Sequence, residues 1–355
     1  MGFDMINREV ALPFIAVVIL SIGLLTLTSV GSALDIQKQF IGVGIALLPL
    51  AIMWFLGRRG LYQLAPAFYF TALFLLLLTF VPGLGVSVNG NRAWLGRGIF
   101  QFQPSEFAKL AMILMLSRFM REPVRSLKDY IPVAAVSLPV MALTSADLGG
   151  VIVQMAITLG MMVIRGIPWR HFLIGLAILT VAIPTLVVPH LKEYQIKRFT
   201  IFLNPDADLR GLGYQLNQAK IAIGSGGLTG KGYKQGSQSQ GGFVPAAHTD
   251  FIFAPWAEEQ GFIGGAFLIL MYMALFWRMN AMGGECLSNQ DKLVTGGVLS
   301  LLGFQVFVNL GAALGFAPLT GLTLPLVSYG ISSLLSVSIA LGMVYIIHRD
   351  RFTEF

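Results

Sequence analysis

Runs of apolar residues bounded by charged residues, Gly or Pro follow one another along most of this chain and constrain its fold more than any other feature. Seven are clear: Ala11–Ala33, Phe40–Leu56, Tyr62–Phe80, His171–Pro189, Gly261–Trp277, Leu293–Leu314 and Ile331–Ile347. Three contain charge or lie close together: Pro104–Met120, Ile131–Ala146 and Gly149–Ile164. A helix needs about 20 mostly apolar residues to cross a bilayer, and fewer where its ends snorkel. The sequence therefore predicts an all-α integral membrane protein with about ten transmembrane helices.

The composition excludes a soluble protein, because 55% of the residues are hydrophobic and only 12% are charged. The net charge of +7 comes from basic residues between the apolar runs, where they orient a membrane protein, so we expect no nucleic-acid partner. The single cysteine, Cys286, has no partner for an internal disulfide and belongs to no metal-ligand pattern. The first run is too long for the core of a signal peptide. We expect residues 1–355 to form one polytopic membrane domain.

Positive charges concentrate in alternate connections between the runs. With the N-terminus inside, the inner segments hold Arg8, Arg58, Arg59, Arg118, Arg121, Arg125, Lys128, Arg165, Arg170, Arg278, Lys292, Arg349 and Arg351. The short outer loops hold only Lys38, Arg92 and Arg97. Because positive residues favour the cytoplasmic side, both termini are predicted to be cytoplasmic. The long connection of residues 190–260, between the seventh and eighth expected helices, is then extracytoplasmic.

This connection of about 70 residues is unusually long, and such loops are more often functional than idle. Residues 214–223 have helical spacing with one apolar side, compatible with a helix on the membrane surface. The Gly-rich residues 224–242 do not form a phosphate-binding loop, because Ser225 stands at its first glycine position and Gly232 follows Lys231. We expect a flexible cationic segment in which Lys231 approaches an anionic substrate.

Asp250 ends the long connection, directly before the aromatic run "FIF". Partial burial beside aromatic rings would raise the pKa of this carboxyl and suit it to act as a base. The alternative is that Thr249 or Asp250 caps the helix containing Glu258 and Glu259, and the residues alone leave both interpretations open. Glu258 and Glu259 are expected to give electrostatic support near the helix start, and His248 to be a surface group.

Two further pairs carry charge near the membrane. Glu106 and Lys109 are three residues apart, so a helix places them on one face, where they neutralise each other. Charges at membrane depth mark a functional interior by default, and a structural ion pair is the alternative. Arg92 and Arg97, on an outer loop, suit a diphosphate or a carboxylated peptide, unless the loop is merely solvated.

Several motifs, in order along most of the chain, resemble the SEDS family of shape, elongation, division and sporulation proteins. They are "NGNRAWL" (residues 89–95), "FQPSEFAKL" (102–110), "AKIAIGSGGLTGKGY" (219–233), "GSQSQ" (236–240), "HTDFIFA" with "AEE" (248–259) and "TLPLVSYG" (323–330). Within the family, "GSQSQ" and the short N-terminal tail are more similar to the members that act in cell elongation than to those that act in division.

The resemblance implies a ten-helix peptidoglycan glycosyltransferase in the bacterial cytoplasmic (inner) membrane, polymerising lipid II on its outer face. The family's essential loop aspartate corresponds to Asp250, and its paired glutamate and lysine to Glu106 and Lys109. Ser328, in the motif "TLPLVSYG", is a further candidate substrate-binding residue. The implied partners are lipid II, membrane lipid and a class B penicillin-binding protein with transpeptidase activity.

The implied reaction inverts the anomeric carbon. Undecaprenyl-diphosphate-linked sugars are α-linked, so one displacement by the 4-hydroxyl of the acceptor gives a β-1,4 bond. Asp250 would accept the proton, or hold Mg²⁺ or Mn²⁺, although the sequence shows no dedicated metal cage. Cationic groups, with Arg92, Arg97, Lys109 and the loop lysines as candidates, would offset charge on the leaving diphosphate.

Two other classes of function stay open from the residues. A lipid II flippase would use the same apolar groove and buried ion pair, but it would need no base at the outer surface. A secondary transporter is expected to show internal repeats and broken helices that carry charge at the midplane, and the sequence shows no convincing repeat.

Overall fold

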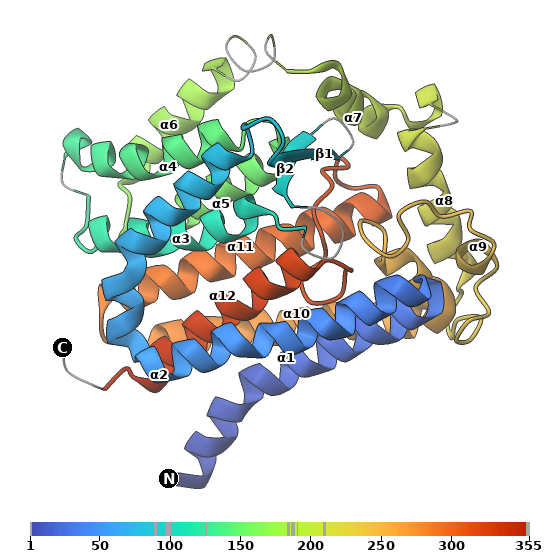
Figure 1. The fold of residues 1–355 in the computed structure, drawn as a ribbon, viewed down its shortest axis with the longest axis horizontal. Coiled ribbons are helices and arrows are strands. Elements are labelled where there is room, and N and C mark those ends of the chain that lie inside the picture. Colours follow the sequence, from blue (N-terminus) through green and yellow to red (C-terminus); the bar gives the residue numbers. More distant parts are fainter. Residues whose placement is uncertain are drawn as a thin grey trace.

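The computed structural model describes residues 2–88, 91–96, 101–124, 126–182, 185, 189, 191–208 and 211–352. Long helices lie side by side, and shorter elements gather toward one end (Figure 1). The main helices are α1 (Gly2–Val30), α2 (Ala33–Leu78), α3 (Pro104–Phe119), α4 (Ile131–Leu143), α5 (Leu148–Arg165), α6 (Trp169–Ala182), α10 (Phe253–Glu285), α11 (Asn289–Leu314) and α12 (Ile331–Arg349).

Six helices are long and apolar enough to cross a membrane, counted over the described residues: α1, α2, α5, α10, α11 and α12. Their outward faces carry large apolar side chains, for example Phe55, which is 87% exposed, and Trp277, which is 80% exposed. Such faces are stable against lipid and not against water. The prediction of an integral membrane protein that crosses the membrane several times is confirmed at this level.

Most of the expected apolar runs coincide with helices, and α2 contains two of them. Of the run expected at His171–Pro189, α6 covers the part up to Ala182, and most of the remainder lies outside the described residues. Its axis breaks at Gly57, which has φ 62° and ψ −174°. The run expected at Gly261–Trp277 is part of a longer helix, because α10 begins at Phe253 and breaks at Gly261, with φ 67° and ψ −165°. A side chain at Gly261 would lie 2.3 Å from the backbone nitrogen of Gly230, so this break lets the 226–230 turn approach α10.

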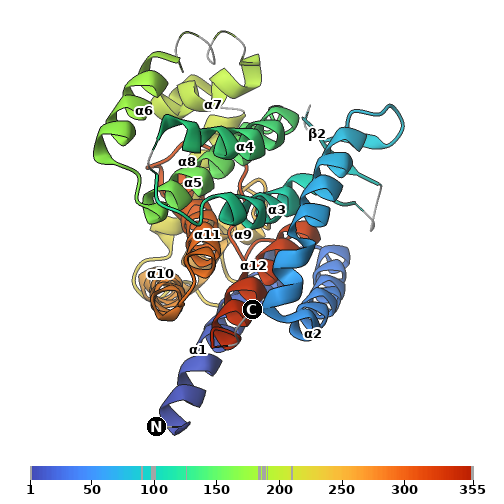
Figure 2. The same ribbon diagram turned by 90° about the vertical axis from the view of Figure 1, so that its left-hand side faces the viewer.

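The core surrounds α3, which Figure 2 shows in the middle of the bundle beside α11 and α12. Residues Leu110 to Leu114 of α3 are at most 1% exposed. Polar residues in this helix are therefore held inside the protein and away from lipid, which allows Glu106 and Lys109 to exist at this depth.

A two-stranded antiparallel hairpin departs from the predicted all-α fold. Strands β1 (Gly85–Val88) and β2 (Asn91–Leu95) follow α2, with Val86 paired to Trp94. An isolated bridge joins Leu95 to Phe102, and this bridge leads the chain into α3. The alternation in "GVSV" is too short to distinguish a strand from a loop by sequence alone.

The connection of residues 190–260 is mostly structured. It contains α7 (Glu193–Leu203), the short 3₁₀ helix η5 (Pro205–Asp208), α8 (Leu212–Ser225) and α9 (Ser237–Gln240). The helix expected at residues 214–223 is confirmed as α8. Figure 1 shows α7, α8 and α9 toward the end of the bundle opposite the C-terminus.

Candidate active site

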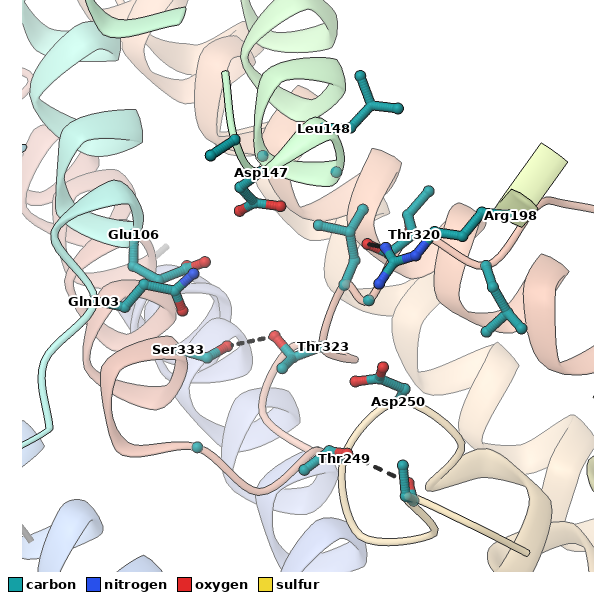
Figure 3. A pocket seen from close by; sticks show the side chains of 18 of the residues that line it. Gln103, Glu106, Asp147, Leu148, Arg198, Thr249, Asp250, Thr320, Thr323 and Ser333 are labelled. Atoms are coloured by element: carbon teal, nitrogen blue, oxygen red, sulfur yellow. Dashed lines mark hydrogen bonds between the residues drawn. The ribbon is translucent and has the colours of Figure 1, made fainter. Parts of the chain in front are cut away.

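A cavity of about 390 Å³ lies where the hairpin, α3, α7 and two loops meet. Its walls come from β2, from the start of α3, from the turn between α4 and α5, from α7, from the loop before α10 and from the loop before α12. Three carboxylates line it, those of Glu106, Asp147 and Asp250 (Figure 3). Segments distant in the sequence thus bring their acids to one space.

Asp250 lies in the loop before α10 and does not cap that helix. The N-cap of α10 is Ile252, and no side chain caps it by a hydrogen bond. The capping alternative is therefore wrong. The half-buried carboxyl lines the cavity, and burial raises its pKa above the ordinary value for an aspartate. The guanidinium of Arg198 acts in the opposite direction and limits this increase.

The loop that carries Asp250 is fixed through its backbone by two other elements. The Ser328 hydroxyl donates to the carbonyl oxygen of Thr249 at 2.6 Å, and the Tyr329 N–H donates to that of His248 at 2.9 Å. The side-chain amide of Asn309, from α11, donates to the carbonyl oxygen of Asp250 at 2.9 Å. These bonds hold the main chain and leave the Asp250 carboxyl directed into the cavity.

Ser328, predicted to bind substrate, has a different place. It is 4% exposed and lies outside the cavity lining. Its hydroxyl donates to Thr249 and accepts the Leu324 N–H at 2.8 Å. The serine therefore positions the loop that carries Asp250, and the assignment as a substrate contact is corrected.

Glu106 and Lys109 form the expected ion pair, with 2.8 Å between Oε1 and Nζ. Ser336 of α12 donates to the other carboxylate oxygen at 2.9 Å. Glu106 reaches the cavity, whereas Lys109 is 1% exposed and lies behind it, outside the lining. The lysine thus neutralises a cavity carboxylate from the protein side.

Asp147 occupies the N-cap position of α5 and also lines the cavity. Burial raises its pKa. Nearby, the Tyr194 hydroxyl of α7 donates to the carbonyl oxygen of Ala146 at 2.7 Å. This bond attaches α7 to the turn that holds Asp147.

Arg198 is a cavity residue that the sequence did not reveal. It lies on α7, lines the cavity and donates from Nη1 to the carbonyl oxygen of Thr320 at 2.6 Å. No motif or neighbouring residue distinguishes it from the other basic residues of the connection. The available signal was the helical spacing of "EYQIKRF", which puts Tyr194 and Arg198 on one face.

Lys231 does not line the cavity. Its ammonium lies 2.7 Å from the Glu258 carboxylate and donates to the hydroxyls of Ser225 and Ser237 at 2.6 and 2.8 Å. The Gly-rich segment, expected to be flexible and cationic, is instead folded around a buried acid. That expectation is corrected, and Glu258, expected to give electrostatic support near the helix start, accepts hydrogen bonds from this segment.

Of the two arginines of the outer loop, the structure describes only the backbone of Arg92, which pairs with Ser87 in the hairpin. The backbone of Arg92 lies on β2, two residues before Trp94, which lines the cavity. The side chain of Arg92 and the whole of Arg97 lie outside the described residues. Their binding of a diphosphate stays a prediction.

The donor set does not by itself suit a metal ion. Within the described part of the chain, no group of three or more His, Cys, Asp or Glu side chains could hold one. The cavity carboxylates come from separate walls, and Glu106 is already paired with Lys109. A cation here would need ligands from a bound substrate.

The family profile described as "Cell cycle protein", which covers FtsW, RodA and SpoVE, matches residues 5–352. This chain belongs to that family. The match spans nearly all of the sequence and confirms the SEDS resemblance that the motifs predicted.

Two named relatives of the FtsW/RodA/SpoVE family are similar to this chain over most of its length. The chain is 37% identical over 328 residues to "Peptidoglycan glycosyltransferase MrdB" of Escherichia coli K12, covering 90% of this chain and 88% of the relative. It is 38% identical over 288 residues to "Stage V sporulation protein E" of Bacillus subtilis, covering 78% and 76%.

Among solved structures, the rod shape determining protein RodA of Thermus thermophilus superposes with a TM-score of 0.73 at 36% identity, covering 97% of both chains. A chain from a structure described as a peptidoglycan synthase complex superposes with a TM-score of 0.86 at 39% identity, covering 97% of this chain and 98% of that one.

Proposed function

We propose that this protein is a peptidoglycan glycosyltransferase that polymerises lipid II into β-1,4 glycan strands at the outer face of the cytoplasmic membrane, during cell elongation. The observation that carries the proposal is the Asp250 carboxyl, which lines a cavity while the backbone of its loop is held by Ser328, Tyr329 and Asn309. The family supports it, since relatives are named peptidoglycan glycosyltransferases.

The chemistry requires one base. The 4-hydroxyl oxygen of the acceptor sugar forms a bond to the anomeric carbon of the donor, whose bond to the diphosphate oxygen breaks. The hydroxyl proton passes to Asp250, and undecaprenyl diphosphate leaves with the electron pair. Burial raises the pKa of Asp250 toward the working pH, which makes the carboxylate a better proton acceptor than an exposed aspartate. Because the displacement is single, the α-linked donor gives a β-linked product.

The proposed topology has about ten membrane crossings in one domain, residues 1–355, with both termini cytoplasmic and residues 190–260 outside. The distribution of basic residues supports it. The cavity is lined at the start of α12 by Gly330, Ser332 and Ser333. Toward the far end of α12 lie two ion pairs, Arg58 with Asp291 and His348 with Glu285. At 1.5 Å per residue these ends are about 28 Å apart, close to the thickness of a bilayer core.

A class B penicillin-binding protein with transpeptidase activity is the proposed partner, supported by the likeness to a chain from a peptidoglycan synthase complex. Mg²⁺ or Mn²⁺, if the reaction uses either, would be held by Asp250 together with the oxygen atoms of the diphosphate, which suit such ions. A lipid II flippase would not require an acid fixed in this position, so we do not favour that alternative.

The test is polymerisation by the purified protein with its partner. Wild type, Asp250→Asn and the control Asp208→Asn are given lipid II in detergent, and the products are separated on a gel that resolves glycan strands. Asp208 pairs with Lys197 at 2.9 Å outside the cavity. We expect strands from the wild type and the control and none from Asp250→Asn at an unchanged melting temperature. Strands from Asp250→Asn, or none from the wild type with a competent partner, would refute the proposal.

A further inference from the structure

The cavity contains an excess of acidic groups, although the proposed donor is itself anionic. Of the residues that line it and are described, Arg198 is the basic one, against the three carboxylates of Glu106, Asp147 and Asp250. The ammonium groups of Lys109 and Lys231 are each bonded to a glutamate and lie outside the lining. Within the described lining, Arg198 therefore supplies the attractive charge for a diphosphate that enters this space.

We propose that Arg198 binds the diphosphate of the lipid-linked donor and offsets the negative charge that grows on it as the bond to the anomeric carbon breaks. This inference rests on the proposed function and assigns a residue to the leaving group. Arginine suits the role because its planar fork of five N–H donors fits two phosphate oxygens at once.

The guanidinium is held in place without being neutralised. One nitrogen, Nη1, donates to the carbonyl oxygen of Thr320, a neutral group. Among the described residues, no carboxylate lies within the 4.0 Å of an ion pair with Arg198. A cation fixed by a neutral acceptor keeps its charge and donors for a ligand, and it loses little side-chain entropy on binding.

Gly321 lies close to both Arg198 and the proposed base. A Cβ at Gly321 would lie 3.4 Å from Nη1 of Arg198 and 3.8 Å from Oδ2 of Asp250, so a side chain there would take space next to both groups. Figure 3 shows Arg198 and Asp250 entering the cavity from different segments. An in-line displacement needs the base and the leaving group apart, with the anomeric carbon between them.

The helix that carries Arg198 also provides a matched control. Lys197 is its neighbour in the sequence, but its side chain is 53% exposed and pairs with Asp208 on the outer side of α7. Replacing Lys197 removes one positive charge from the same helix without changing the cavity. Any effect specific to Arg198 is therefore separable from a change in net charge.

The first experiment measures binding without turnover. Undecaprenyl diphosphate is titrated in detergent against Asp250→Asn and against the same protein with Arg198→Ala, Arg198→Lys or Lys197→Ala, with melting curves to establish folding. A charge-assisted bond contributes about 1.5–3 kcal/mol, so we expect Arg198→Ala to bind about 10- to 100-fold more weakly. The affinity of Arg198→Lys should lie between those of Asp250→Asn and Arg198→Ala, and the affinity of Lys197→Ala should equal that of Asp250→Asn.

Undecaprenyl monophosphate serves as a second ligand in the same assay. If Arg198 binds the diphosphate, the preference for diphosphate over monophosphate shrinks in Arg198→Ala and persists in Lys197→Ala. Unchanged affinity in Arg198→Ala, or equal losses in Arg198→Ala and Lys197→Ala, would overturn the inference.

Kinetics distinguish this inference from the proposed function. In an active wild-type background, Arg198→Ala should lower kcat by more than it raises KM, because the charge on the leaving group grows in the transition state. It should also move the acidic limb of the pH profile upward, since Arg198 holds down the pKa of Asp250. If the wild type is active and Arg198→Ala changes neither kcat nor the acidic limb of the pH profile, the inference about Arg198 is refuted and the proposed function stands. If the wild type is inactive, the proposed function is refuted, and the binding assay still tests Arg198.

Discussion

Glu258 organises residues 225–242 of the long connection, and replacing it should release that segment. The carboxylate is fully buried and accepts six hydrogen bonds, four of them at 2.9 Å or less and two at 3.4 Å from the hydroxyls of Ser225 and Ser237. Lys231 Nζ lies at 2.7 Å and the Gln238 N–H at 2.9 Å from Oε1, while the N–H and hydroxyl of Ser239 lie at 2.9 and 2.5 Å from Oε2. All of these donors lie between the last residue of α8 and the end of α9.

Glu258→Gln keeps the shape but replaces one acceptor oxygen with an NH₂ group. Whichever oxygen is replaced, one buried backbone N–H, of Gln238 or Ser239, then faces another donor, which costs about 1–3 kcal/mol. Loss of the ion pair with Lys231, whose side chain is 26% exposed, adds to this. We expect the free energy of unfolding to fall by about 2–4 kcal/mol, below the range for removing one partner of a fully buried pair.

Hydrogen exchange and thermal melting are the assays for Glu258→Gln. Amide protection should fall in residues 225–242 and stay unchanged in α11, and the melting temperature should decrease. Glu193→Gln, an exposed acid in the first turn of α7, is the control and should change neither. Protection of residues 225–242 at the wild-type level in Glu258→Gln would refute the view that this carboxylate holds the loop together.

Three further predictions concern the cavity and the bundle. Burial raises the pKa of Asp250 above its value in the unfolded chain, so ionisation of this carboxyl near pH 7 lowers the free energy of unfolding. Asp250→Asn should therefore have a melting temperature at pH 7 no lower than that of the wild type. The activity of the wild type should be lost as the pH falls through a pKa above the ordinary aspartate range. Lys109→Ala should lower the free energy of unfolding by about 3–5 kcal/mol, because it leaves the Glu106 carboxylate buried without its ion-pair partner. The double variant Glu106→Gln with Lys109→Met should lower it by less, and a double-mutant cycle measures the difference. Gly261→Ala should cost more than the roughly 1–2 kcal/mol of a positive φ, because its Cβ meets the backbone of Gly230; an unchanged melting temperature would contradict the packing described.

The helices and one catalytic candidate were predictable because their signals are local. Apolar runs such as Leu293–Leu314 coincide with helices, since a lipid-exposed segment must satisfy its own backbone hydrogen bonds. The pair of Glu106 and Lys109 follows from helical spacing alone. Asp250 is conspicuous because an ionisable group beside an apolar run is costly unless something uses it or pairs with it.

The remaining features depend on contacts between distant segments. Arg198 and Asp250 face one cavity only because α7 folds back against the turn at Ala146, and no spacing in the sequence encodes that approach. Lys231 looks like a free cation in the sequence, whereas in the structure it is the half-buried partner of the buried Glu258.

The sequence by itself determined that this is a polytopic membrane protein of the FtsW/RodA/SpoVE family, with an acid at the end of its long connection, because hydropathy and motifs are properties of consecutive residues. The tertiary structure alone decided which charges reach the cavity and which are neutralised. Electrostatic energy depends on distances of a few ångströms and on burial, and both are set by packing between segments far apart along the chain.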